Sequence, residues 1–323
     1  MRETQNDVSP ETAMSLAPAA AVPRATSDSM PFAIALFCVL WSFAFVAGKI
    51  GVTYCPPLIL LTARFLFAGV LILAISAFRR GAGSLSGSLS WRDVIVFAIL
   101  GVANNALYLG LGYTGLKSVS AGLGALIVSA NPVFTAALAA LFLGEQLTFR
   151  KVAGLALGII GVAMIVWHRM AVGTDSFHGI LFTLASLASI VLGTILFKWL
   201  SPQGSLWIGN GVQNVAAGLA LLPFATAFAD VNDITPNARL LGAFAFLVLG
   251  GSILAYVLWF RLLKTYGATA ASAYHFLMPP LGMLFAWIVL GEHVAFRDLS
   301  GVVPVALGIY LVTRPSAPNG SRP

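Results

Sequence analysis

The chain has 323 residues, of which 59% are hydrophobic and only 9% are charged. A soluble protein of this length needs more polar residues to cover its surface, so the composition excludes a soluble globular protein and predicts an integral membrane protein. The formal net charge of +7 comes from basic residues scattered singly between apolar runs, which argues against the basic patch of a nucleic-acid-binding protein.

The chain begins with a polar stretch rich in Ala, Pro and Ser, so we expect a disordered tail at 1–30 and no signal peptide. Apolar runs long enough to span a bilayer, roughly 20 residues each, follow it. They are expected at 32–51, 57–78, 91–112, 119–143, 149–167, 177–197, 206–228, 238–260, 268–290 and 298–313. A second tail is expected at 315–323. The sequence therefore predicts an all-α polytopic membrane protein with ten transmembrane helices.

An internal repeat divides the chain into two halves. The segment 116–161 aligns without a gap with 263–308, which lies 147 residues later, and 12 of the 46 positions are identical. Identical pairs that apolar bias does not explain include Pro132 with Pro279, Glu145 with Glu292, and Arg150 with Arg297. We expect one five-helix repeat at 31–168 and a second at 177–314.

The distribution of Lys and Arg predicts the orientation of the chain. With the N-terminus inside, twelve basic residues fall on the cytoplasmic side and five on the other side. Because cytoplasmic loops retain positive charge, both termini are expected in the cytoplasm. Five spans in each half is an odd number, so the second half enters the membrane from the opposite face and the repeat is inverted. Inverted repeats recur in alternating-access carriers, which bind their substrate between the two halves.

Several short motifs resemble a known family. The run Trp41 to Gly51, then Pro56-Pro57-Leu58 and Ala63-Arg64-Phe65, resembles the opening of EamA-type members of the drug/metabolite transporter superfamily. The turns Gly144-Glu145 and Gly291-Glu292 resemble the Gly-Glu turn of each repeat in that family. The resemblance covers about 32–313 and implies a ten-helix carrier that exports amino acids or other small metabolites.

The second half departs from the first in its opening helix. It lacks the Trp-Ser opening, and Gln213 stands roughly where Arg64 stands in the first half. The second half is therefore not a functional duplicate of the first. The expected location is the cytoplasmic (inner) membrane of a bacterium.

Two basic residues are candidates for substrate binding. Arg64 lies about 10 Å into its span at 1.5 Å per residue, where an arginine costs about 3 kcal/mol to insert, so it needs a reason to be there. Lys49 lies near the same end of the preceding span. Together they could hold a substrate carboxylate or phosphate. Alternatively, Arg64 bonds helix-end carbonyls or snorkels outward, and Lys49 is an interface anchor.

Amide side chains form two further candidate groups. Asn210, Gln213 and Asn214 have the i, i+3, i+4 spacing that makes a polar stripe on one helix face. Asn104, Asn105 and Tyr108 form a similar polar group on another helix. Such groups face the bundle interior or an aqueous cavity, where partners exist. They either contact a substrate or only hold helices together by hydrogen bonds.

His275 is the one histidine near the middle of a predicted span, and Tyr274 precedes it. A buried histidine that titrates near neutrality can carry a coupling proton. The alternative, which we favour, is a neutral hydrogen-bonded core histidine. Tyr274 is a candidate for lining the substrate path, as are Trp41 and Trp259, although aromatic residues in membrane helices are also interface anchors.

None of the eleven carboxylates lies in the interior of a predicted span, since Asp93 and Asp298 lie at span ends, which argues against a buried acidic proton carrier. Glu145 and Glu292 precede helices, and their expected role is capping of a helix N-terminus. Pro132 and Pro279 lie near the middle of the fourth and ninth spans, so we expect kinks that could act as hinges. The glycines of the fifth span form a small-residue face for internal packing or for a homodimer.

These observations predict a secondary transporter of a small-molecule substrate that works by alternating access in the lipid bilayer. No GxxxxGK[ST] motif is present, so energy would come from the substrate gradient or a coupled ion. We expect no catalytic residue, metal site or cofactor. The alternatives are a passive channel and a membrane-embedded enzyme, which would need a His/Asp/Glu cluster that the sequence does not provide convincingly.

Overall fold

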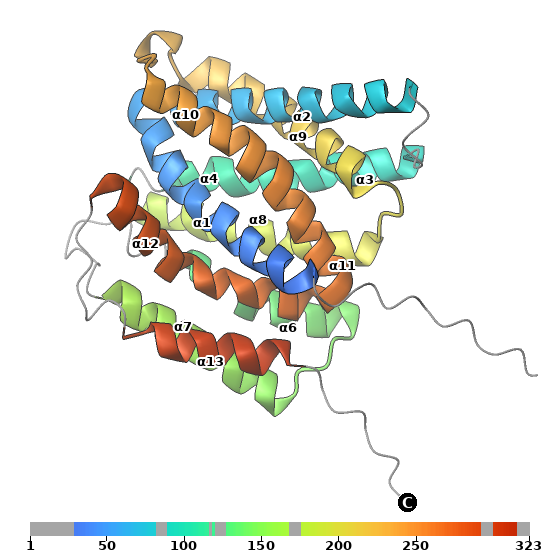
Figure 1. Cartoon of the computed structure of the whole chain (residues 1–323), viewed down its shortest axis with the longest axis vertical. Helices are drawn as coiled ribbons and strands as arrows, with labels where there is room; N and C mark the ends of the chain where they lie inside the picture. Colours follow the sequence, from blue (N-terminus) through green and yellow to red (C-terminus); the bar gives the residue numbers. More distant parts are fainter. Residues whose placement is uncertain are drawn as a thin grey trace, which may run out of the picture.

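A computed structural model describes residues 29–81, 89–115, 118–119, 127–167, 176–291 and 300–314. Every regular element in these ranges is a helix (Figure 1). The first half contains α1 (Ser29–Tyr54), α2 (Pro57–Gly81), α3 (Trp91–Gly101), the π-helical η1 (Val102–Leu107), α4 (Tyr108–Gly115), α6 (Asn131–Leu143) and α7 (Phe149–Trp167). The second half contains α8 (Phe177–Leu200), α9 (Leu206–Phe228), the 3₁₀ turn η2 (Val231–Asp233), α10 (Ala238–Phe246), the π-helical η3 (Leu247–Ala255), α11 (Tyr256–Ala273), the 3₁₀ turn η4 (Tyr274–Leu277), α12 (Met278–Leu290) and α13 (Val302–Thr313).

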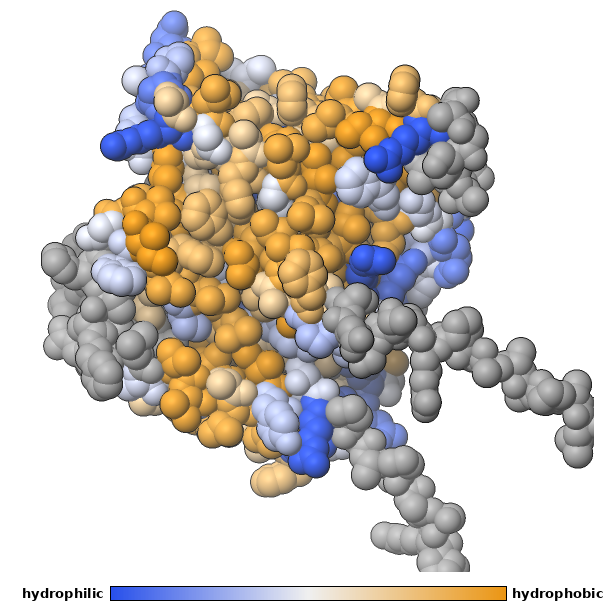
Figure 2. Space-filling model, in the orientation of Figure 1, coloured by the Kyte–Doolittle hydropathy of each residue, from blue (hydrophilic) through white to orange (hydrophobic). Residues whose placement is uncertain are grey.

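Within the described ranges, six helices are long and apolar enough to cross a membrane. One of them runs over 53 residues, 238–290, and Gly267 interrupts it with a non-helical backbone (φ 82°, ψ 173°) between the predicted eighth and ninth spans. Shorter apolar helices cover 127–143 and 302–313. On the face shown in Figure 2, hydrophobic residues cover the middle and hydrophilic ones gather toward the edges. The chain is thus an all-helical polytopic membrane protein, and the number of ten spans stays a prediction.

The backbone repeats itself at the spacing of 147 residues. Gly144 and Gly291 end α6 and α12 in nearly the same left-handed conformation, with φ values of 66° and 68°. Glycine fits both positions because it adopts the left-handed backbone conformation more readily than residues with a Cβ. The two π-helical segments also correspond, since η1 shifted by 147 residues falls within η3. Both halves therefore fold by the same local geometry.

Both prolines lie within the predicted fourth and ninth spans, each at the start of a helical segment. Pro132 is the second residue of α6, after a turn at Ala130, and Pro279 is the second residue of α12, after the turn η4. A proline in the first turn of a helix removes no helical hydrogen bond, because that N–H has no partner in the helix. Each of these spans therefore departs from regular α-helical geometry just before its proline.

Helix α7 packs against its counterpart α13 through glycines. A Cβ added at Gly154 would lie 2.7 Å from the carbonyl oxygen of Gly308, and one added at Gly161 would lie 2.6 Å from that of Gly301. Gly301 is the repeat partner of Gly154, and Gly308 is that of Gly161, so equivalent residues exchange contacts between antiparallel helices. A two-fold axis perpendicular to the helices produces this pattern, which is the geometry of an inverted repeat. The glycine face of α7 therefore packs within the chain.

Candidate functional site

A cavity lies between helices of the two halves. Its empty volume is about 400 Å³, including space open to solvent. It is lined by Trp41, Ala44 and Phe45 of α1, Arg64 of α2, Tyr108, Leu109 and Tyr113 of α4, Gly251 and Ala255 of η3, and Tyr256 of α11.

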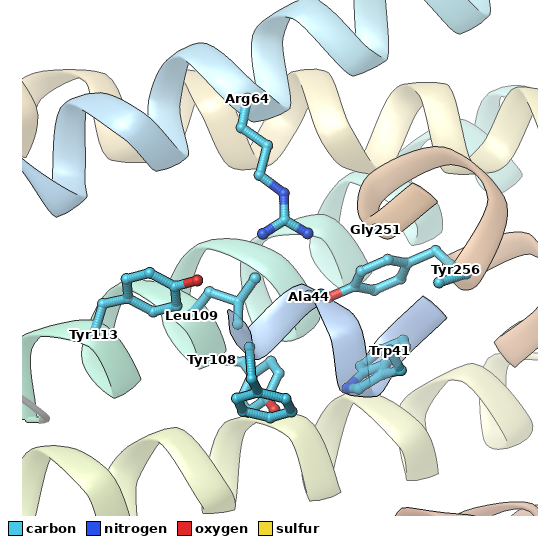
Figure 3. Close-up of a pocket in the computed structure, with 10 residues that line it drawn as sticks. Trp41, Ala44, Arg64, Tyr108, Leu109, Tyr113, Gly251 and Tyr256 are labelled. Carbon is cyan, nitrogen blue, oxygen red and sulfur yellow. The ribbon is translucent and has the colours of Figure 1, made fainter. Parts of the chain in front are cut away.

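Arg64 enters the cavity from α2, and its side chain is only 3% exposed. Its Nε donates a hydrogen bond of 2.8 Å to the hydroxyl oxygen of Ser252, and its Cζ lies 5.3 Å from the ring centroid of Phe65. Its two terminal nitrogens point into the cavity between Tyr113 and Tyr256 (Figure 3). A Cβ at Gly251 would lie 2.9 Å from one of those nitrogens, so the guanidinium can occupy this place because residue 251 is glycine.

Two amides of α9 support the segment that carries Ser252. The Nδ2 of Asn210 donates to the backbone oxygens of Ser252 (2.9 Å) and Ile253 (3.1 Å). The Nδ2 of Asn214 donates to the Oδ1 of Asn210 at 3.0 Å. A π-helical segment departs from the regular α-helical hydrogen-bond ladder, and these carbonyls need partners in a membrane interior. Asn210 and Asn214 thus stabilise η3, and Ser252 of η3 in turn holds the guanidinium of Arg64 in place.

Tyrosines form the walls opposite Arg64. The hydroxyls of Tyr113 and Tyr256 point toward the space below the guanidinium (Figure 3). The Tyr256 hydroxyl donates a hydrogen bond of 2.8 Å to the backbone oxygen of Asn104. The Ser186 hydroxyl donates one of 2.6 Å to the backbone oxygen of Tyr108. Both bonds engage carbonyls in or next to η1, so each half contributes a π-helical segment to the region of the cavity.

The predicted site residues are only partly brought together. Arg64 and Tyr108 line the cavity, and Asn210 and Asn214 lie behind Arg64. Lys49 is exposed and is not among the cavity-lining residues. The structure therefore separates the two cations that the sequence suggested as one niche.

Asn104 and Gln213 are buried beside the cavity and do not line it. Both are 0% exposed, and their side-chain amide atoms have no hydrogen-bond partner in the described part of the chain. Asn104 lies against Gly193 of α8, where a Cβ would clash with its Oδ1. The backbone of Gln213 lies against Gly101 of α3. The amide of Asn104 thus fills a contact between helices, whereas Gln213 contacts α3 through its backbone.

His275 lies in an aromatic cluster next to the cavity. Its ring centroid is 4.8 Å from that of Trp259 and 5.6 Å from that of Trp41, which also lines the cavity. Its Nδ1 is 3.1 Å from the backbone oxygen of Ser272. The neighbouring Tyr274 packs instead against Tyr266, with ring centroids 6.4 Å apart.

Glu145 joins the two halves at one end of the bundle. Its carboxylate accepts hydrogen bonds from the backbone N–H groups of Ala268 (2.7 Å) and Thr269 (3.2 Å). These residues begin the helical segment after Gly267, so the carboxylate caps a helix of the opposite half, although it precedes α7 in sequence. The related Glu292 lies outside the described residues.

Removing this cap is expected to destabilise the protein. Glu145→Ala should lower the free energy of unfolding by about 1 kcal/mol, the usual loss for a helix cap. Glu145→Gln should have a smaller effect, because its amide oxygen still accepts a hydrogen bond but loses the charge that favours a helix N-terminus. Thermal unfolding of the purified variants should give the order wild type, Gln, Ala. Asp233→Ala removes an exposed loop carboxylate as a control, and equal melting of Glu145→Ala and wild type would exclude a stabilising cap.

Several cavity residues were not predicted as site residues from the sequence. They are Ala44, Phe45, Leu109, Tyr113, Gly251, Ala255 and Tyr256, together with Ser252 behind them. Most of them belong to apolar runs and carry no charge that marks them as unusual in a membrane helix. The cluster Gly250-Gly251-Ser252 was the available signal, because small residues in a span allow a close approach.

Comparisons with known proteins agree with this architecture. The model of the EamA-like transporter family matches residues 29–167 and 177–314. A "Probable amino-acid metabolite efflux pump" of Salmonella typhimurium is 28% identical over 87% of this chain and 93% of its own length. An "Uncharacterized transporter" of Archaeoglobus fulgidus is 27% identical over 87% of this chain and 97% of its own length. A protein crystal structure matches with a TM-score of 0.73 at 15% identity, covering 89% of this chain and 97% of that chain, which supports the fold alone.

Proposed function

The chain belongs to the EamA-like transporter family, and from this premise we propose that it is a secondary carrier that moves small metabolites by alternating access. That the chain is a membrane transporter follows from the family and from relatives named as transporters. The carrier would consist of two inverted repeats, 31–168 and 177–314, that rock around a central site. The backbone breaks before Pro132 and Pro279 are the proposed hinges, because they interrupt equivalent spans at equivalent positions.

The observation that carries this proposal is the cavity between the two halves with Arg64 buried in its wall. A buried arginine is costly in a membrane protein and is typical of a substrate pathway. Its terminal nitrogens can bind an acidic group through two parallel hydrogen bonds. We propose export of amino acids or related compounds, which the printed names of the Salmonella typhimurium and Escherichia coli relatives favour.

We place the protein in the inner membrane of a bacterium with both termini in the cytoplasm. The excess of basic residues on the proposed cytoplasmic side supports this orientation. The beginning of α1 and the end of α13 also lie toward the same side of the bundle (Figure 1). In this orientation the contact between Glu145 and Ala268 joins the two halves at the cytoplasmic end, while Arg64 lies nearer the outer end of α2. That arrangement fits one state of an alternating-access cycle.

A solute counterflow experiment tests the transporter mechanism. Purified protein in liposomes preloaded with an unlabelled small metabolite should accumulate the labelled compound transiently, with a rate that saturates at high concentration. Exchange that grows linearly with concentration would indicate a passive channel. Chemical conversion of the compound would indicate a membrane enzyme. Either result would overturn the carrier proposal.

A further inference from the structure

The charges around the cavity are unbalanced. Arg64 is the only charged side chain among the residues that line it, and none of these residues is a carboxylate. Of the carboxylates described, Glu145 bonds the end of a helix, and Asp93 bonds the hydroxyl of Ser90 and the N–H of Gln203. A ligand in the cavity therefore meets one positive charge and no negative charge on the wall.

The other walls are mostly aromatic. Half of the ten lining residues are Trp, Tyr or Phe, and Trp41, Tyr108 and Tyr256 are almost completely buried. Such rings make the wall mostly apolar, with a few hydroxyl groups. They suit a ligand with an apolar or aromatic body, while Arg64 suits its acidic end.

An ammonium group on the same ligand would fit poorly. Inside the cavity it would lose its hydration and would find no carboxylate on the wall to compensate. Cation–π contacts with the aromatic rings stabilise an ammonium ion, but this stabilisation is smaller than the free-energy cost of removing the ion from water. A ligand whose only charged group is a carboxylate also loses its hydration. For this ligand, hydrogen bonds to the guanidinium of Arg64, which Ser252 holds in place, replace the lost hydrogen bonds to water.

We propose that the Arg64 cavity selects net monoanions, with one carboxylate on an apolar or aromatic body, over zwitterions of the same body. This inference rests on the proposed transporter function and narrows it, since it places amino acids below the corresponding acids that lack the ammonium group. The selection comes from the single guanidinium and from the lack of acidic residues among those that line the cavity.

A charge series on one molecular body tests the selection. Proteoliposomes would exchange labelled 3-phenylpropionate, and 3-phenylpropionate, phenylalanine and phenethylamine would compete from outside. Liposomes without protein correct for passive diffusion of the protonated acid. Phenylalanine is expected to need at least about a tenfold higher concentration than 3-phenylpropionate for half inhibition, as expected from about 1.4 kcal/mol of discrimination. Phenethylamine is expected not to compete.

The outcomes separate this inference from the transporter function. If phenylalanine gave half inhibition at the same concentration as 3-phenylpropionate or at a lower one, anion selection would be overturned. The transporter function would still stand, because exchange would remain saturable. If none of the three compounds and no mixture of small metabolites exchanged, both proposals would fall. Competition in the expected order supports both.

A pair of variants tests the role of charge separately from size. Ala44 lines the cavity on α1, and Ala44→Asp and Ala44→Asn add side chains of nearly equal volume that differ in charge. The Asp variant should bind Arg64 in place of the ligand, so its exchange of 3-phenylpropionate should fall at least about tenfold below that of the Asn variant. If the Asp and Asn variants had the same melting temperature and exchanged 3-phenylpropionate at the same rate, electrostatic selection would be contradicted.

Discussion

Replacing Arg64 with alanine is expected to abolish exchange of an acidic substrate. Two hydrogen bonds to a charged group contribute about 1.5–3 kcal/mol each, so their loss should weaken binding by at least about 100-fold. Arg64→Lys keeps the positive charge but loses the planar pair of donors, so it should retain part of the binding. Binding isotherms of the purified variants and counterflow rates would measure both effects.

The matched control is Arg79→Ala, which removes an exposed arginine from the same helix. This variant should exchange substrate like the wild type. Because removal of Arg64 also takes away the Ser252 hydrogen bond, each variant must first be compared by its melting temperature and its elution as a single species. A folded Arg64→Ala variant with wild-type exchange would show that the guanidinium does not bind the substrate.

Asn210→Leu is expected to destabilise the protein and impair exchange together. Asn210 is fully buried and donates to the backbone oxygens of Ser252 and Ile253. Leaving a buried acceptor without a partner costs about 1–3 kcal/mol, although the mean contribution of such bonds between membrane helices is nearer 0.6 kcal/mol. With two carbonyls affected in a segment that already departs from α-helical bonding, we expect a loss of about 2 kcal/mol.

Exchange should decline in this variant even where the protein stays folded, because Ser252 positions the Nε of Arg64. Asn232→Leu changes an exposed asparagine of the loop before α10 and serves as the control for the substitution itself. Denaturation midpoints and counterflow rates would be measured on the same preparations. A variant that melts and exchanges like the wild type would exclude the supporting role of the amide stripe.

Much of the fold is predictable because the membrane restricts the choices. Backbone groups in lipid must be satisfied within a helix, so each apolar run of about 20 residues is expected to be helical. α9 has the bounds 206–228 that its apolar run predicts. The repeat likewise anticipates the equivalent breaks at Ala130 and Leu277, although it does not distinguish a kink from a broken helix.

The site is less predictable because it depends on how helices face one another. Arg64 was identifiable from its depth and cost alone, whereas Tyr113 and Tyr256 look like ordinary residues of membrane helices. The π-helical segments η1 and η3 shift the faces of their spans relative to a regular helix, and no motif announces them. Glu145 illustrates the same point, since the sequence places it before α7 but its hydrogen bonds go to Ala268 in the other half.

The most direct test of the central claim is an experimental structure with the best-exchanged compound bound. We predict that its acidic group lies within hydrogen-bond distance of both terminal nitrogens of Arg64, with its body between the rings of Trp41, Tyr113 and Tyr256. A ligand bound elsewhere in the protein, with the Arg64 cavity making no contact to it, would contradict the claim that this cavity is the substrate site.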